Sequence, residues 1–162
     1  MCKLSEKPHK KPDILGIVTF GFILLLVGMI FVITPNLVER ISDFLQDFEI
    51  REIAPHWALI APKSYHPVLY TAIFQFCLAF AIFQVFVLVA RFILRDPMDR
   101  VAGTISSIVF WFGASWIVNL LITKTVGWFV FLGWLIALIG TSIIIKNAIV
   151  LMTKIFARPH PL

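Results

Sequence analysis

The chain has 162 residues, of which 60% are hydrophobic and only 14% are charged, and its mean hydropathy is +0.95. Ordinary soluble domains are about 45–50% apolar and about 25% charged, so this composition excludes a soluble globular domain, a disordered chain and a coiled coil. The net charge of +5 comes from basic residues at the ends of apolar runs and near the N-terminus, which is typical of membrane proteins and not of nucleic-acid binding. We therefore predict an all-α, polytopic membrane protein.

The first element is a basic segment, residues 1–13, followed by an uncharged run over residues 14–34. At about 1.5 Å per residue this run crosses the roughly 30 Å hydrocarbon core of a bilayer. It exceeds the apolar core of a cleavable signal peptide, about 7–15 residues, and we interpret it as an uncleaved first span. Cys2 leaves reversible acylation open, whereas Cys77 lies inside a later apolar run and is expected to be a small buried hydrophobe.

Residues 35–67 form a polar region after the first span. Residues 36–53 repeat apolar side chains at helical spacing with charges on the opposite side, which predicts an amphipathic helix on the membrane surface or over the end of the bundle. The apolar positions are Leu37, Ile41, Phe44, Leu45 and Phe48. Residues 54–67 contain three prolines and are expected to form an extended, turn-rich loop.

Three more apolar runs complete a predicted bundle of four transmembrane helices. We place these spans at residues 68–94, 101–122 and 126–145, within a membrane domain that covers residues 14–153. Residues 147–153 are still mostly apolar, so the last helix can continue into the interface, and a basic tail, residues 154–162, follows.

The distribution of basic residues predicts the orientation. Four spans put both termini on one side, and ten of the 14 Lys and Arg residues lie on that side against four on the other. The positive-inside rule then places both termini in the cytoplasm and residues 35–67 outside. We expect a multi-pass protein of the cell membrane.

A polar stripe is predicted on the second span, where Gln84, Arg91 and Arg95 lie seven and four residues apart on one helical face. Such a stripe can line the bundle interior or a cytoplasmic vestibule. The plainer interpretation, which we prefer, is that Gln84 makes one hydrogen bond between helices while the arginines meet lipid phosphates.

Small residues recur at helical spacing in the last two spans and predict seams where helices approach closely. They are Gly103, Ser106, Ser107, Gly113 and Ala114 in the third span, and Gly133, Ala137 and Gly140 in the fourth. The alternative is that one seam forms a dimer interface. We also expect Trp111, Trp116 and Trp134 to pack between helices.

No catalytic, cofactor or metal site is predicted. No Asp, Glu, Lys, Arg or His lies in the central part of any span, and such residues are the usual mark of proton relays and ion paths. The sequence also lacks the HExxH, GxSxG and P-loop motifs. His56 and His66, near two glutamates, are too few for a metal site with three or four converging ligands, and we expect both histidines at headgroup level.

Several segments carry a resemblance to other proteins. They are RVAGTISSIVFWFGAS at residues 100–115, GWFVF at 127–131, PDILGI at 12–17 and ITPNL at 33–37. Together they resemble a group of small uncharacterised archaeal membrane proteins. The resemblance implies four helices and brings no activity and no functional residue with it.

The leading hypothesis is a non-enzymatic accessory or scaffold subunit that contacts the lipid bilayer and associates with other membrane proteins or with a second copy of itself. The alternative is a small oligomeric channel or transporter with its pore between protomers. That pore would be lined by Ser106, Ser107, Asn119 or Gln84. A membrane enzyme that uses the loop histidines is the least favoured class.

Overall fold

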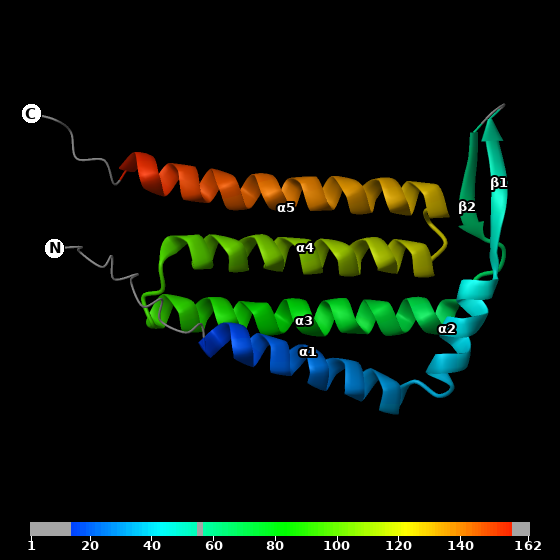
Figure 1. Ribbon diagram of the computed structural model, residues 1–162, viewed down its shortest axis with the longest axis horizontal. Coiled ribbons are helices and arrows are strands. Elements are labelled where there is room, and N and C mark those ends of the chain that lie inside the picture. Colours follow the sequence, from blue (N-terminus) through cyan, green and yellow to red (C-terminus); the bar gives the residue numbers. More distant parts are fainter. Residues whose placement is uncertain (1–13, 55–56, 157–162) are drawn as a thin grey trace, which may run out of the picture.

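The computed structural model describes residues 14–54 and 57–156, which form five α-helices and one two-stranded hairpin (Figure 1). The elements are α1 (Ile14–Ile33), α2 (Leu37–Gln46), β1 (Phe48–Ala54), β2 (Trp57–Pro62), α3 (Pro67–Ile93), α4 (Met98–Ile122) and α5 (Trp128–Phe156). The four long helices lie alongside one another in the order α1, α3, α4, α5. We call the end that carries α2 and the hairpin the hairpin end, and the opposite end, where α1 begins and α5 ends, the terminal end.

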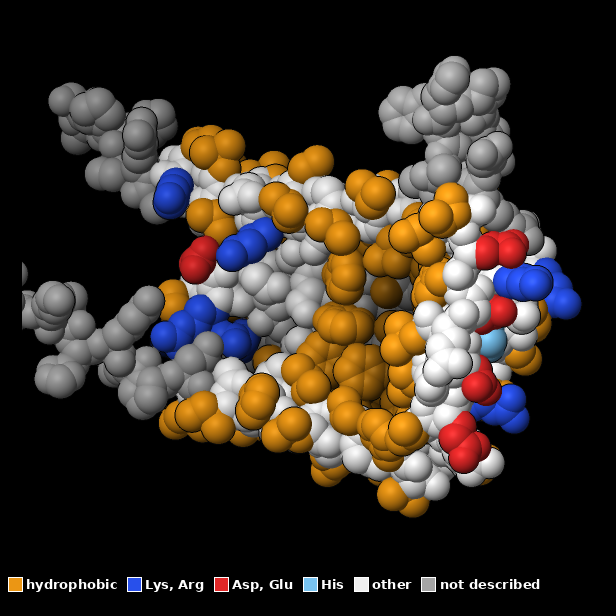
Figure 2. Space-filling view, turned by 45° about the vertical axis from the view of Figure 1, so that its right-hand side comes forward, with side chains coloured by type: hydrophobic (Ala, Val, Ile, Leu, Met, Phe, Trp, Pro, Cys, Tyr) orange, Lys and Arg blue, Asp and Glu red, His pale blue; other side chains and the backbone are white. Residues whose placement is uncertain are grey.

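The four long helices are each long and apolar enough to cross a membrane. The prediction of four apolar spans packed against one another is confirmed, and such helices indicate a multi-pass membrane protein. Figure 2 shows a broad hydrophobic surface between two charged ends. The largest departure from the expected bounds is in α5, which continues past Lys146 to Phe156. Its 29 residues measure about 43 Å, so α5 extends beyond the hydrocarbon core.

Two of the long helices end in the same kind of turn. Arg95 (φ 51°) and Lys124 (φ 56°) adopt the left-handed conformation just after α3 and α4. The following amide reaches back five residues in each case, from Asp96 N to Arg91 O and from Thr125 N to Leu120 O, both at 3.0 Å. This Schellman arrangement satisfies carbonyl groups that the helix end would otherwise leave without a donor, which permits the short connections to α4 and α5.

The region after α1 differs from the expectation. The predicted helix over residues 36–53 ends at Gln46, and the predicted loop is a hairpin in which β1 pairs with β2 in antiparallel register, Phe48 opposite Pro62 and Ala54 opposite Trp57. Both predictions for this region are therefore wrong beyond Gln46. The physical reason is that the paired strands satisfy their backbone groups with each other, while the prolines of residues 54–67 keep a helix from continuing through the second strand.

Two buried apolar clusters hold the hairpin end together. One joins α3, α4 and α5 around Tyr70, Val118 and Phe131, and the other joins α2 and α3 around Leu37 and Leu69. A further side chain, Phe44 of α2, packs against both clusters. The short amphipathic helix thus lies over the end of the bundle and connects its two cores.

Asp47 links α2 to the segment that leads into α3. Its amide N–H caps α2 by donating to Asp43 O, and its carbonyl accepts from Lys63 N at 2.9 Å. Its carboxylate accepts from both the amide and the hydroxyl of Ser64, and from His66 Nε2 at 2.9 Å. The hydrogen bond from His66, followed by that from the Ser64 amide, lowers the pKa of Asp47 below its ordinary 3.8.

We predict that Asp47→Asn destabilises the protein at neutral pH, because the amide is a poorer acceptor for His66 and Ser64 than the carboxylate. Because the pKa of Asp47 is lower in the folded state than in the unfolded state, the ionised carboxylate stabilises the fold at pH values above the unfolded-state pKa. This stabilisation is lost as the pH falls through the folded-state pKa. The difference in thermal unfolding midpoint between wild type and D47N should therefore shrink below about pH 4. Asp43→Asn, an exposed change on the same helix, is the control and should leave the midpoint unchanged at both pH values.

Candidate functional site

Polar contacts join α3, α4 and α5 in the half of α4 nearest the terminal end. Gln84 Nε2 of α3 donates to Ser107 Oγ of α4 at 3.1 Å. Ser106 Oγ of α4 donates to the carbonyl of Ser142 on α5 at 2.6 Å, and Ser142 Oγ donates to the carbonyl of Ser106 at 3.1 Å. Three polar side chains that the sequence singles out, Gln84, Ser106 and Ser107, are thus hydrogen-bonded within the chain.

The small residues of α4 lie inside the protein. A Cβ at Gly113 would collide with the side chain of Leu138 on α5, and Ala114 is buried. Gly103 lies farther toward the terminal end and lines a polar cavity. The seam on α4 therefore packs against the chain's own helices at Ser106, Ser107 and Gly113, as close helix approach requires, whereas nothing lies within 4 Å of a Cβ built at Gly103.

The small residues of α5 lie on the outside. Nothing in the described chain comes within 4 Å of a Cβ built at Gly133 or Gly140, and Ala137 is exposed. We call these three residues the α5 small-residue face. Spacings of four and three residues place them on one side of the helix. Gly133 and Gly140 have no neighbouring helix in the part of the chain that the structure describes, whereas Ala137 also lines a cavity with Gly113 and Trp116 of α4.

Two tryptophans flank this face. Trp134 is 56% exposed and Trp116 is 68% exposed, so the expectation that both pack between helices is wrong. Only Trp111 of the three does so, with its ring 4.9 Å from that of Phe80. Trp134 and Ala137 line a shallow cavity of about 390 Å³ beside the α5 small-residue face. The sequence could not show whether the helix face that carries each tryptophan packs against another helix.

A polar cavity of about 340 Å³ lies at the terminal end and has walls from all four long helices. Gln84 and Arg91 of the predicted stripe line it together, and Arg91 is only 7% exposed. Arg95 does not continue the stripe, because α3 ends at Ile93 and the left-handed turn leaves Arg95 exposed and outside the lining. The residues that sequence reasoning missed here are Arg100, Thr104 and Lys146, which lie on other helices and share no spacing with the stripe.

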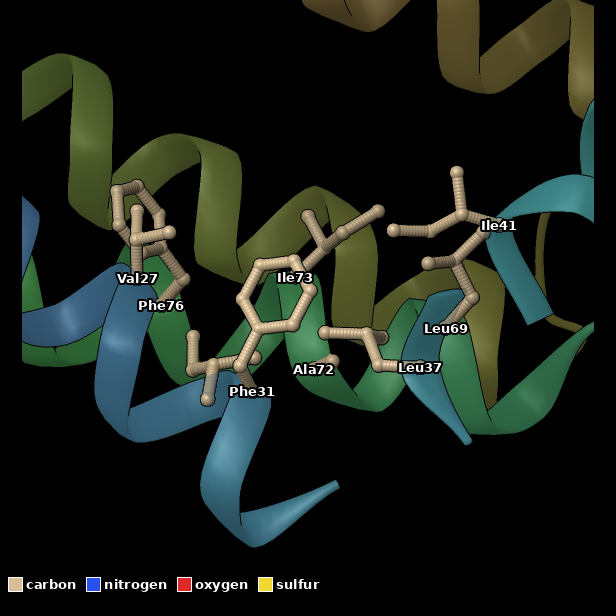
Figure 3. A pocket seen from close by; sticks show the side chains of 9 residues that line it. Val27, Phe31, Leu37, Ile41, Leu69, Ala72, Ile73 and Phe76 are labelled. Atoms are coloured by element: carbon tan, nitrogen blue, oxygen red, sulfur yellow. The ribbon is translucent and has the colours of Figure 1, made fainter. Parts of the chain in front are cut away.

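A second cavity, of about 260 Å³, lies between α1, α2 and α3 (Figure 3). Val27 and Phe31 reach it from α1, Leu37 from α2, and Ala72 and Phe76 from α3. Every side chain that lines it is apolar. It can hold a hydrocarbon chain but offers no polar group that would select one ligand over another.

The histidines do not converge on a metal site in the described chain. His66 donates to Asp47, and His56 lies outside the described residues. Residues 14–54 and 57–156 contain no group of three or more His, Cys, Asp or Glu side chains placed to hold a metal ion. Cys77 is buried, and Cys2 is also outside the described residues.

Comparison of the chain with protein-family models, with curated proteins and with solved structures found no match. The resemblance to small archaeal membrane proteins therefore stays a prediction.

We predict that Gly113→Val destabilises the protein by about 1–3 kcal/mol, the usual effect of overpacking, because its branched side chain would push Leu138 and α5 away from α4. Gly140→Val places the same side chain where nothing lies within 4 Å, and it should change the free energy of unfolding by no more than about 0.5 kcal/mol. Denaturant unfolding in detergent measures both. Equal stabilities for the two variants would show that α4 and α5 do not approach at Gly113.

Proposed function

We propose that the protein is a non-enzymatic accessory or scaffold subunit of a membrane assembly, and that the α5 small-residue face contacts a helix of another membrane protein. One observation carries this proposal: nothing in the described chain lies within 4 Å of a Cβ built at Gly133 or Gly140, and Ala137 between them is exposed. Small residues that already pack within the chain, such as Gly113, have a structural use. Those on α5 have none within the described residues.

The physics of helix association in lipid supports this use. Lipid tails are as apolar as leucine, so no hydrophobic force drives two helices together, and close backbone approach through small residues takes its place. Gly133 and Ala137 leave room for such an approach along about one turn of α5. Trp134, which lies beside them, adds the large aromatic area that is common where a few residues dominate an interface.

An oligomeric channel or transporter has less support. Of the four side chains expected to line its pore, Gln84, Ser106 and Ser107 are hydrogen-bonded within the chain. Gln84 and Ser107 line only the cavity at the terminal end, and Asn119 is exposed on the other half of α4. A water-filled path across the membrane needs polar groups along its length, and these side chains do not provide them.

We further propose that both termini are cytoplasmic and that the membrane is the cell membrane. The support is the excess of Lys and Arg toward the terminal end, which includes Arg91, Arg95, Arg100, Lys146 and Lys154. The hairpin end has only four basic residues in the sequence around it. By the positive-inside rule the terminal end then faces the cytoplasm, and the hairpin faces outward.

The test is purification of the tagged full chain from its native membrane in a gentle detergent, with the mass and the co-purifying proteins determined together. We expect a partner in stoichiometric amount. The double variant Gly133→Leu/Ala137→Leu should reduce the amount of that partner about tenfold or more, because each leucine holds the two backbones apart; a tenfold change corresponds to about 1.4 kcal/mol.

Gly21→Leu is the matched control, because Gly21 of α1 also has nothing within 4 Å of its Cβ position and lies on the far side of the helix row. It should retain the partner. If the double variant also retains it, the α5 small-residue face is not the contact. A homo-oligomer without any partner would contradict the accessory role and favour the oligomeric channel.

A further inference from the structure

The polar cavity at the terminal end has more positive than negative charge around it. Arg91, Arg100 and Lys146 line it, and among the described residues Asp99 is the one acidic side chain of the lining. Asp96 stands next to the two arginines, 3.1 Å from Arg91 and 4.0 Å from Arg100. Among the described residues at this cavity, three cations therefore meet two carboxylates, which leaves one positive charge in excess.

The arginines are held in place. Arg91 is buried, and Asp96 accepts a hydrogen bond from its Nη1. Arg100 lies one turn after Asp96 and approaches the same carboxylate. Asp96 thus holds the Arg91 guanidinium by a hydrogen bond and draws that of Arg100 toward the same side of the cavity, while Lys146 approaches from α5. A preorganised pair of guanidinium groups is the arrangement that recognises a phosphate through several charge-assisted hydrogen bonds.

The cavity is deep enough to hold a lipid headgroup and the part of the lipid directly below the headgroup. Arg91 lies near the end of α3, whereas Gln84, which also lines the cavity, lies nine residues before that end, or about 13 Å. The headgroup region on each side of a bilayer is roughly 5–8 Å thick. The lining therefore runs from charged groups at phosphate level, past the ester bonds, to the hydroxyl of Ser107 and the amide of Gln84 at the start of the hydrocarbon core.

The open side of the cavity, between α1 and α5, favours a lipid over a free anion. In the described chain α1 and α5 make no extensive contact with each other, so no helix pair closes the bundle between them. An acyl chain can leave the cavity there and lie on the hydrophobic surface that continues from the charged end (Figure 2). Inorganic phosphate would gain nothing from this apolar side.

We propose that this cavity binds an anionic membrane phospholipid, with its phosphate held by Arg91, Arg100 and Lys146. Ser107, whose hydroxyl accepts from Gln84 and keeps its own O–H as a donor, lines the deeper part of the cavity, below the phosphate. The site is independent of the α5 small-residue face, so either proposal can fail while the other holds.

The experiment measures the thermal unfolding midpoint of the delipidated full chain in a nonionic detergent with three separate probes: dioleoyl phosphatidylglycerol, dioleoyl phosphatidylcholine and inorganic phosphate. At about 100 times the dissociation constant, a site-bound lipid should raise the midpoint by about 5–10 °C. We expect this shift with phosphatidylglycerol, and at most half of it with either of the other probes.

Lys146→Gln is the first variant, because Lys146 is exposed and its loss should leave folding intact; Arg100→Gln is the second. Each should lose at least half of the phosphatidylglycerol shift. Lys63→Gln makes the same change at an exposed residue of the hairpin end and should keep the whole shift.

Equal shifts with phosphatidylcholine would overturn recognition of an anionic lipid, and equal shifts with inorganic phosphate would overturn the lipid as the source of the phosphate. An unchanged shift in both cavity variants would overturn the site.

Discussion

The hydrogen bonds that connect α3, α4 and α5 are the interaction on which the rest of this structure depends. Inside a bilayer, helices that are apolar on all sides have no hydrophobic reason to choose one neighbour or one face over another. Polar atoms do have a reason, because an unsatisfied polar group in hydrocarbon is costly. The reciprocal bonds between Ser106 and Ser142, together with the bond from Gln84 to Ser107, therefore set how these helices are turned toward one another.

This rotation decides which surfaces remain for function. With Ser142 and Leu138 turned toward α4, the side of α5 that carries Gly133 and Gly140 faces away from the bundle. With Gln84 turned toward α4, Arg91, two turns farther along α3, lies on the same side and enters the polar cavity. The proposed partner face and the proposed lipid site thus follow from the same few contacts.

The hairpin end is stabilised by different forces. There the polar groups can reach water, and the cap is fixed to the bundle by aromatic packing around Phe44 and by the Asp47 hydrogen bonds. Tyr65 adds a hydrogen bond from its hydroxyl to the carbonyl of Ile122, and Lys124 lies 4.5 Å from the centre of the Tyr65 ring. The turn between α4 and α5 is therefore tied to the segment before α3, which closes the end of the bundle.

The sequence predicts the parts of this fold that depend on composition and spacing. The four spans follow from apolar length, and the end of α3 follows from Asp96-Pro97. The hairpin was missed because the helical spacing of Leu37, Ile41 and Phe44 continues by chance to Phe48, where strand pairing takes over.

The candidate sites were predictable only in part. Residues on one helix, such as Gln84 and Arg91, share a face that spacing reveals. Lys146 and Arg100 join them only through packing between helices, which a single sequence does not encode in any simple period. The same limit explains why Trp116 and Trp134 could not be placed on an exposed surface in advance.

The most direct test of the account is a cross-link between α4 and α5 in the native membrane. The chain would carry Ser106→Cys and Ser142→Cys, with Cys2 and Cys77 replaced by alanine and a protease site in the turn between α4 and α5. The two serine oxygens lie 2.7 Å apart, so the introduced cysteines should form a disulfide when a mild chemical oxidant is added to take up the two electrons and two protons. The account predicts that the two fragments stay linked after proteolysis until a reductant is added. Fragments that separate without a reductant would contradict the packing on which both proposed surfaces depend.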